Sequence, residues 1–254
     1  MSSGFTHIGA GISNQTMPNQ QAYYPSAYSF SNEQANAKLT FYADNDNLDK
    51  AEQTLALFNR HGFRPSLVNY TKMINAYGRS GRLDAAFNIF QTMQRNGMKP
   101  TTFQYNALMH QCLQNGQEGR VFNLFHEMRQ NWVMPNKITH IHLISANVNL
   151  RNMTRARQIF RDYIGMPNAS MRSGKPHVDC HGLSPQAAFV QLTEFLSSHH
   201  GEPFSVIVGQ GLHSKGKFQM KEYMLEKLKG SNYLDVTVRQ DNPGILDVSF
   251  SDIA

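Results

Sequence analysis

The sequence predicts a multidomain chain in which an all-α solenoid of repeated helical hairpins is followed by a two-layer α/β sandwich of order βαβαββ. Three observations predict this fold. A 35-residue period runs through the first two thirds of the chain, a Pro-, Ser-, Gly- and Asn-rich stretch follows, and strands then alternate with helices. We therefore expect a disordered leader at 1–29, the repeats at 30–165, a linker at 166–176 and the α/β domain at 177–254.

The composition limits the class of protein. Cys112 and Cys180 lie outside any CxxC spacing, which argues against a zinc ribbon or a disulfide framework. No run of about 18 apolar residues occurs, so no membrane span is predicted. Residues 1–29 contain no Lys or Arg, unlike a secretory signal or a transit peptide. We expect the cytoplasm as the compartment, with an organelle as the alternative.

The net charge of +6 is concentrated in the middle of the chain. Residues 65–165 contain twelve Lys or Arg and four Asp or Glu, whereas the segments before and after this one each have a net charge of −1. A basic segment between near-neutral ends favours a polyanion-binding surface, although solvated cations scattered over the surface would give the same count.

Turn residues and apolar residues recur every 35 positions. Pro65, Pro100 and Pro135 keep this spacing, as do Tyr70 and Tyr105. Each unit also contains two apolar stripes at helical spacing, and in the second unit Gly78-Arg79-Ser80-Gly81 separates them. In the second unit the stripes are Tyr70, Met73, Ile74 and Tyr77, then Leu83, Ala86, Phe87, Phe90 and Met93. A hairpin this small cannot bury its own stripes, so about four units must stack.

This period, the opening Val68-Asn69-Tyr70-Thr71-Lys72-Met73-Ile74 and the ending Asn96-Gly97-Met98-Lys99-Pro100 resemble the pentatricopeptide-repeat family. Units 67–101 and 102–136 match well, and the units on either side are divergent. The resemblance implies binding of single-stranded RNA, with about one base for each repeat.

In that family the base is contacted by the residue after the first-helix Tyr and by the residue after the closing Pro. An apolar residue three positions before the first of these wedges against the base. The matching positions here are Val68, Thr71 and Thr101 in one unit, and Phe103, Asn106 and Asn136 in the next. In the end units, Glu33 stands at the wedge position and Ile141 at a reading position, so two or three bases are expected to be read. Lys and Arg side chains would contact phosphates.

Beyond the linker, the pattern predicts alternating strands and helices. Ser184 and Pro185 have the residue types of an N-cap and a first helical position. The expected elements are a strand at 177–181, a helix at 184–199, a strand at 204–208, a helix at 217–230, and strands at 235–239 and 245–250.

Two groups of polar residues fall at the ends of the first two strands. His177, Asp179 and His181 alternate along one strand, so their side chains are expected on one face. The second strand ends in a glycine loop at 209–216, and such a loop at the start of a helix binds anions through its N–H groups. Because both groups follow strand ends, they could line one crevice. A polar edge strand with solvated histidines is the alternative.

These groups also carry a second resemblance. The strand Val178-Asp179-Cys180-His181-Gly182-Leu183, the loop Val208-Gly209-Gln210-Gly211-Leu212-His213-Ser214 and a closing hairpin around Asn242-Pro243-Gly244 resemble the small MutS-related (Smr) domain. That family has a fold like the C-terminal domain of translation initiation factor three. Its members act on nucleic acids, several of them as nicking or RNA-cleaving endonucleases, and some bind without cutting. This chain departs from the family pattern at two positions. Cys180 stands where an aliphatic residue is usual, and Val208 stands where many members have Thr.

The resemblance implies the site residues. Asp179 and His181 match positions tied to cleavage, and the glycine loop matches the position tied to nucleic-acid contact. We expect His181 as general acid or base, Asp179 as its orienter or as a ligand to a divalent cation such as Mg²⁺, and His213 at the transition state. Expected nucleic-acid contacts in the loop are Gly209, Gly211, Ser214, Lys215 and Lys217. His177 is expected to be a solvated neighbour, and no metal-ligand set is assigned.

The leading hypothesis is therefore an RNA-binding repeat protein whose Smr domain is an endonuclease acting on single-stranded RNA. One alternative is an RNA-binding protein without catalytic activity, acting in transcript stabilisation or translation. Another is a DNA-nicking Smr protein. No protein partner is evident from the sequence.

Overall fold

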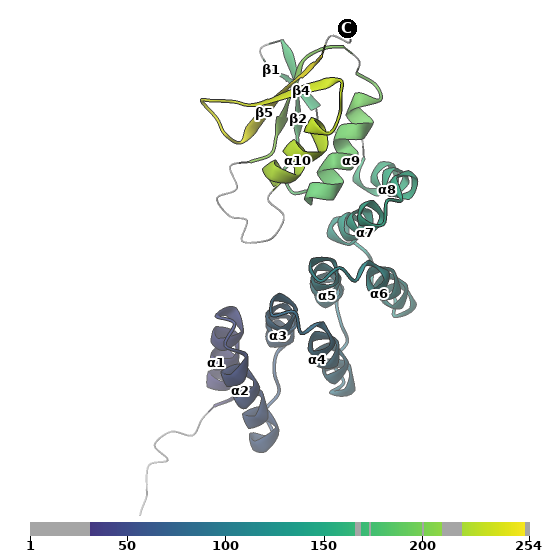
Figure 1. The fold of residues 1–254 in the computed structure, drawn as a ribbon. Coiled ribbons are helices and arrows are strands. Elements are labelled where there is room, and N and C mark those ends of the chain that lie inside the picture. The colour runs from purple at the N-terminus through teal and green to yellow at the C-terminus, as the bar shows by residue number, and fades with distance from the viewer. Residues whose placement is uncertain (1–30, 166–168, 173, 200, 210–219, 252–254) are drawn as a thin grey trace, which may run out of the picture. The chain divides into compact units, whose positions relative to one another are not determined.

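The computed structural model describes residues 31–165, 169–172, 174–199, 201–209 and 220–251, and its elements are labelled in Figure 1. The residues from Asn32 onward form one compact unit. It consists of a helical-hairpin solenoid followed by a small mixed α/β sheet region, which confirms the predicted fold class. In the part of the chain that is described, no helix is long and apolar enough to cross a membrane.

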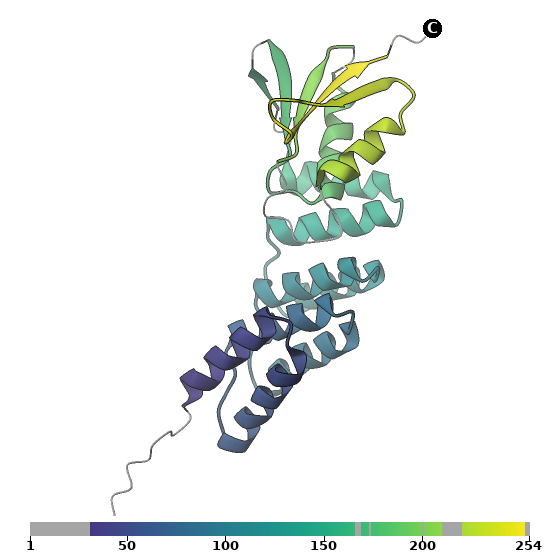
Figure 2. The same ribbon diagram turned by 60° about the vertical axis from the view of Figure 1, so that its left-hand side comes forward.

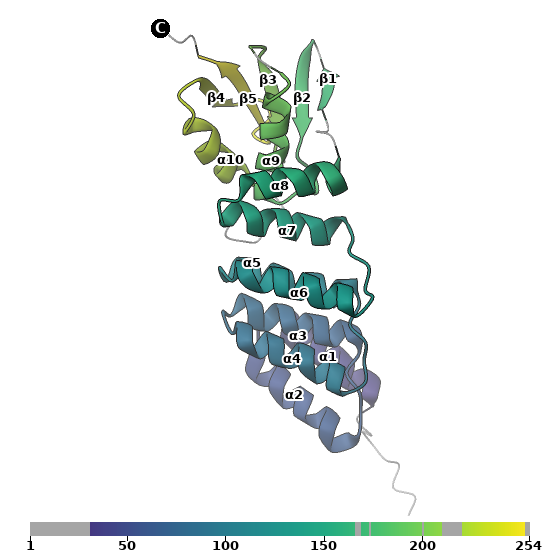
Figure 3. The same ribbon diagram turned by 90° about the vertical axis from the view of Figure 1, so that its right-hand side faces the viewer.

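The solenoid contains four helical hairpins. The first helices of successive hairpins pack directly on one another (Figure 3). The second helix of a hairpin contacts its own first helix and, in the first three hairpins, also the first helix of the following hairpin. The pairs are α1 Asn32–Asp44 with α2 Leu48–His61, α3 Leu67–Arg79 with α4 Leu83–Arg95, α5 Thr102–Gln114 with α6 Glu118–Gln130, and α7 Lys137–Asn149 with α8 Met153–Ile159. A π-helical turn, η1 Phe160–Ile164, continues α8.

The repeated aromatic residues form the solenoid core, as the period predicted. Tyr70 and Tyr105 are fully buried, and each hydroxyl accepts a hydrogen bond of 2.8 Å from an asparagine at the end of its own hairpin, Asn96 or Asn131. A buried tyrosine hydroxyl needs such a partner. The same contact at a spacing of 35 residues shows why these positions repeat.

The turn that closes each hairpin needs a left-handed residue. Gly62 and Gly97 have φ values of 67° and 77°, which a residue without a Cβ adopts at little cost. The next turn departs from this rule, because Trp132 stands at the same place with a φ of 58° and is 91% exposed. For a bulky residue this conformation is strained.

The sheet region contains five strands and two helices in the order β1 Ala169–Arg172, β2 Lys175–Asp179, α9 Pro185–Leu196, β3 Phe204–Ile207, α10 Met220–Lys229, β4 Leu234–Val238 and β5 Ile245–Phe250. The strands lie in the order β1-β2-β3-β5-β4. Only the β2–β3 pair is parallel among these ladders. Strand β1 lies where the sequence predicted only a linker. Its four residues are all exposed, so the ladder with β2 holds it without an apolar pattern.

One face of the sheet packs against both helices (Figure 2). Val178, Val206 and Leu246 lie side by side across β2, β3 and β5, and they share a core with residues of α9 and α10. The opposite face carries His177, Ser205 and Asp247 in the next row. His177 is only 6% exposed, so the expectation of a solvated histidine is wrong. Strand β1, which the sequence did not predict, lies alongside it.

Helix α9 packs on α7 and α8, where a fifth hairpin would otherwise begin. The contacts include polar ones. The hydroxyls of Ser145 and Ser184 are 2.7 Å apart, and Glu194 pairs with Arg157 and with Arg161, the latter at 2.7 Å. Helix α9 thus belongs to the α/β core on one side and covers the last repeat on the other.

Candidate nucleic-acid interface

The turns into α3, α5 and α7 have the same geometry. Each helix begins after an extended N-cap residue, namely Ser66, Thr101 or Asn136. Each N-cap forms a capping box with the third helical residue, at position 69, 104 or 139. The predicted reading residues Thr101 and Asn136 therefore sit at helix starts, where side chains are fixed by backbone N–H groups.

The first predicted pair, Thr71 and Thr101, is linked through Gln104. The Nε2 of Gln104 donates to Thr71 Oγ1 at 2.8 Å, and its Oε1 accepts from Thr101 Oγ1 at 2.7 Å. The hydroxyl of Thr71 donates to the backbone carbonyl of Leu67 at 2.8 Å. The structure thus brings the pair together through a third side chain.

The second predicted pair is in direct contact. The Nδ2 of Asn106 donates to Asn136 Oδ1 at 3.1 Å, and the Oδ1 of Asn106 accepts from Thr139 Oγ1 at 2.8 Å. At the first turn the two residues also meet, but differently: the backbone N–H of Ser66 donates to Asn36 Oδ1 at 2.9 Å. In the divergent first unit, Asn36 therefore bonds the backbone of the N-cap residue and not its side chain.

Apolar side chains flank these polar pairs and face solvent. Val68, Phe103 and Ile138 are each the second residue of their helix, and they are 59%, 78% and 51% exposed. Exposed apolar side chains that recur at one spacing indicate a binding surface, whereas buried ones only indicate a core. They could stack against or between bases. We call Val68, Phe103, Ile138 and the three polar pairs the reading edge.

The residues at 69, 104 and 139 were missed in the sequence analysis. Asn69, Gln104 and Thr139 are polar yet at most 4% exposed. The available signal was a capping-box spacing repeated every 35 residues, as in Ser66-x-x-Asn69 and Thr101-x-x-Gln104.

The basic excess divides into paired and unpaired cations. Lys72, Arg79, Arg82 and Arg120 form ion pairs with Asp44, Asp46, Glu52 and Asp84. By contrast, Arg64, Lys99 and Lys137 make no ion pair with any described residue, and all three are exposed in or beside the turns of the reading edge. Cations left free beside that edge suit phosphate contacts.

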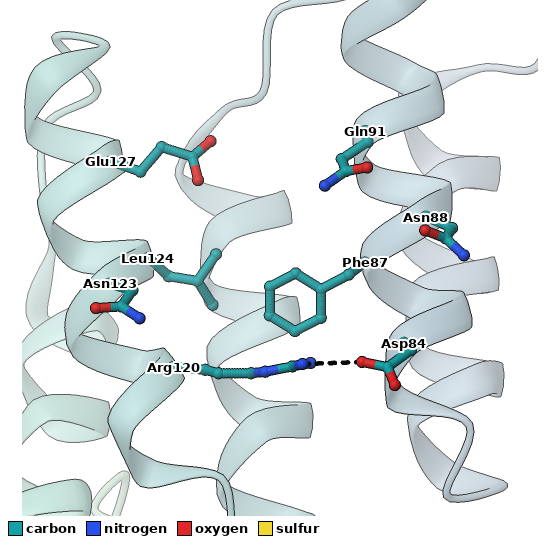
Figure 4. A pocket seen from close by; sticks show the side chains of 8 residues that line it. All are labelled: Asp84, Phe87, Asn88, Gln91, Arg120, Asn123, Leu124 and Glu127. Carbon is teal, nitrogen blue, oxygen red and sulfur yellow. Dashed lines mark ion pairs between the residues drawn. The ribbon is translucent and has the colours of Figure 1, made fainter.

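A separate groove lies between the second helices α4 and α6, with a volume of about 430 Å³. Figure 4 shows the Arg120 guanidinium beneath the Phe87 ring, with its ion pair to Asp84. Glu127 lines the same groove. Two carboxylates against one cation make this groove a poor fit for a polyanion.

The end of β2 brings Asp179 and His181 together. Asp179 Oδ1 accepts from the His181 backbone N at 2.9 Å and lies 2.5 Å from its Nδ1. Burial would raise the pKa of Asp179, but the hydrogen bonds from His181 and the charge of Arg172 lower it overall. The carboxylate is therefore ionised at neutral pH.

The glycine loop begins next to this pair. A Cβ at Gly209 would lie 3.9 Å from His181 Nε2, so the loop starts beside the imidazole nitrogen that is not bonded to Asp179. The side chain of His181 is 67% exposed. The other predicted residues of the loop, Gly211, His213, Ser214, Lys215 and Lys217, lie outside the described residues. Within the described ranges, no three His, Cys, Asp or Glu side chains are grouped so as to hold a metal ion.

Comparisons with known proteins place the solenoid in a family. The pentatricopeptide repeat domain model matches residues 35–80, 55–115, 88–149 and 123–163, which together cover just over half of the chain. Among solved structures, pentatricopeptide repeat protein PPR10 from maize is 23% identical, with a TM-score of 0.48 over 52% of this chain and 19% of that chain.

Two solved complexes are also similar. PPR10 bound to an 18-nucleotide psaJ RNA element is 20% identical, with a TM-score of 0.48, over 54% of this chain and 20% of that chain. The PPR domain of Arabidopsis thaliana protein-only RNase P 1 in complex with tRNA is 16% identical, with a TM-score of 0.45, over 52% of this chain and 72% of that chain. The chain thus spans about a fifth of the length of PPR10. No curated protein sequence gives a match. On the family-model match, the chain belongs to the pentatricopeptide-repeat family.

Proposed function

We propose that this protein binds single-stranded RNA along the reading edge. One observation carries the proposal: three exposed apolar side chains recur every 35 residues, each beside a polar pair held by a buried third side chain. Stacking of a base on such a side chain contributes about 1–3 kcal/mol for an aromatic residue. The polar pairs supply hydrogen bonds to base edges, and Lys99 and Lys137 supply charge for the phosphates.

Replacement of Phe103 tests this interface. Phe103→Ala should weaken binding of an unstructured RNA oligonucleotide by about tenfold, measured by fluorescence anisotropy, because the stacking contact is lost. Phe41→Ala is the matched control, since Phe41 is 62% exposed on α1 but lies outside the 35-residue register. Equal losses in the two variants, or no loss in either, would reject the reading edge.

We further propose that the α/β region is a Smr-like endonuclease with Asp179 and His181 as its catalytic pair. The ionised Asp179 holds Nδ1 of the imidazole, and Nε2 lies close to Gly209, where the glycine loop begins. In RNA, Nε2 would take the proton of a 2′-hydroxyl as its oxygen attacks the adjacent phosphorus. The bond from phosphorus to the 5′-oxygen then breaks, and that oxygen receives a proton from an acid, for which His213 is the candidate.

Binding without cleavage is the second candidate function of this region. It is favoured by the high exposure of His181, because general acid–base groups usually work in enclosed sites. The mechanism above cannot act on DNA, because DNA lacks the 2′-hydroxyl that attacks the phosphorus.

Cleavage assays separate these functions. Labelled single-stranded RNA should be cut by the full chain, and Asp179→Asn or His181→Ala should reduce the rate by about 10²–10⁴-fold while leaving RNA affinity unchanged. Asp235→Asn, an exposed carboxylate on β4, is the control and should cut normally. RNA that is bound but never cut would establish the non-catalytic function. Equal nicking of a DNA strand of the same sequence would exclude the 2′-hydroxyl mechanism.

A further inference from the structure

Three buried polar side chains reach from one hairpin to the preceding one. Asn69, Gln104 and Thr139 are the third residues of α3, α5 and α7, and they are 1%, 4% and 0% exposed. Each makes a side-chain hydrogen bond to the first helix of the hairpin before it. Buried polar groups are costly unless they are bonded in this way. Because these side chains are enclosed, their role toward RNA is exerted through the reading residues.

The hydrogen-bond polarity at Thr71 follows from a fixed backbone donor. The N–H of Thr101 donates to Gln104 Oε1 at 2.9 Å, and a backbone N–H can only donate. The Nε2 end of Gln104 must therefore face Thr71, whose oxygen accepts from it. The hydrogen of the Thr71 hydroxyl is used by the carbonyl of Leu67. One oxygen lone pair remains, so Thr71 offers an acceptor.

A backbone donor also fixes the orientation of the Asn106 side-chain amide, but here the group left over is a donor and not an acceptor. The N–H of Thr139 donates to Asn136 Oδ1 at 3.1 Å, so this oxygen also receives the amide hydrogen of Asn106. The hydroxyl of Thr139 then donates to Asn106 Oδ1. A flipped Asn106 amide would place two oxygens against each other. The Asn106 amide is therefore oriented, and its second Nδ2 hydrogen makes no hydrogen bond to a described residue, in a residue that is 8% exposed.

We propose that Gln104 and Thr139 are positioning residues that set which hydrogen-bonding group the reading residues Thr71 and Asn106 offer to an RNA base. Thr71 offers an acceptor and Asn106 offers an amide N–H, although both stand at the same point of the repeat. The proposal rests on the RNA-binding function proposed above. It makes the third helical residue a determinant of base preference without contact to the base.

Substitutions at both positions test the proposal in the full chain. The probe is a panel of unstructured RNA oligonucleotides in which each of two adjacent bases is varied in turn among all four. Thr139→Val removes the hydroxyl that holds Asn106 Oδ1, so only the contact with Asn136 Oδ1 still orients the Asn106 amide. The ratio of best to worst affinity opposite Asn106 should therefore fall by at least about fivefold, as for loss of one specifying hydrogen bond. Thr139→Ser keeps the hydroxyl and should keep the preference.

Gln104→Glu is an independent variant that is expected to fold. Glutamate at this position preserves the capping box with Thr101 but cannot donate to Thr71. The hydroxyl of Thr71 must turn to the carboxylate, so the base preference opposite Thr71 should change by at least about fivefold. The preference opposite Asn106 should stay the same. Gln91→Glu, an exposed position in the groove between α4 and α6, controls for the added charge.

The outcomes separate this proposal from the function on which it rests. If the wild-type protein binds none of the RNAs, the proposed RNA-binding function fails. If it binds them but the variants lose affinity equally for all bases, or keep every preference, then RNA binding stands and the positioning role is rejected. A change confined to the base opposite the altered repeat supports the proposal.

Discussion

The contact between central repeats and the contact between the last repeat and α9 are made in different ways. Helices α3 and α5 pack so closely that a Cβ at Gly78 would lie 2.3 Å from the side chain of Gln111. The contact of α7 and α8 with α9 depends on the Glu194 ion pairs and on the hydroxyls of Ser145 and Ser184. The central contact is limited by close packing, whereas the contact with α9 includes ion pairs that can titrate. The central contact should therefore be insensitive to pH, whereas the contact with α9 should weaken in acid.

Gly78→Ala is expected to produce the largest change. The added methyl must displace Gln111, which is 3% exposed and donates to Asn75 at 2.9 Å, so unfolding should become easier by about 1–3 kcal/mol. Urea denaturation followed by circular dichroism measures it. Gly119→Ala on α6 is the control, because a Cβ there meets nothing within 4 Å and alanine favours a helix. Stabilisation by both substitutions would show that the α3–α5 contact is loose.

Glu194→Gln tests the charged contact. Burial raises the pKa of Glu194, but hydrogen bonds from Arg161 and Arg157 lower it overall from its ordinary value of 4.5. A carboxyl with a lowered pKa stabilises the fold above its unfolded pKa, and this contribution is lost as the pH falls through the folded pKa. The variant should be about 0.5–1 kcal/mol less stable at pH 7, since these arginines are partly exposed.

The pH dependence is the sharper measurement. The difference in melting temperature between wild type and Glu194→Gln should be constant from pH 7 to pH 5 and should disappear in more acidic solution. Glu226→Gln, which alters an exposed pair with Lys227, should show no such difference at any pH. A difference in melting temperature that persists in acid would mean that packing, and not charge, holds α9 against the last repeat.

Trp132→Gly should give a similarly small change in stability, with the opposite sign. Glycine removes the strain of a left-handed tryptophan, and the exposed ring contributes little packing, so stability should rise by about 0.5–1 kcal/mol. The reverse experiment is Gly97→Ala at the equivalent turn, where φ is 77° and a Cβ meets nothing within 4 Å. It should destabilise by a similar amount, and calorimetric melting compares the two variants. Destabilisation by Trp132→Gly would contradict the strain argument.

The solenoid was predictable from the sequence because its rule is local and repeated. The two central hairpins share a buried Tyr, and three successive turns share a left-handed residue and a closing Pro, so the 35-residue period reveals the repeated hairpin. Strand β1 was not predictable, because none of its side chains is buried and only the ladder with β2 defines it. His177 lies opposite Ser170 of that strand, and its burial was not predicted either.

The sequence predicted some residues of the candidate sites and not others. The resemblance to the pentatricopeptide-repeat family selected Thr71, Thr101, Asn106 and Asn136, and in the structure each pair is linked by hydrogen bonds. The joining residues Gln104 and Thr139 were not selected, because a capping box reads as a helix start and its contact with the preceding helix is long-range. The proximity of Gly209 to His181 likewise depends on strands β2 and β3 being parallel neighbours.

Trp132 has a practical consequence, because it is the one tryptophan in the sequence. Its indole is 91% exposed and lies four residues before Asn136, in the turn that leads to the second predicted base. Fluorescence excited at wavelengths that tryptophan absorbs and tyrosine does not therefore comes from Trp132 alone. A base that binds at Asn136 should quench or shift that emission, whereas events at the Asp179 end of the molecule should leave it unchanged. The chain thus carries an optical label at one repeat without chemical modification.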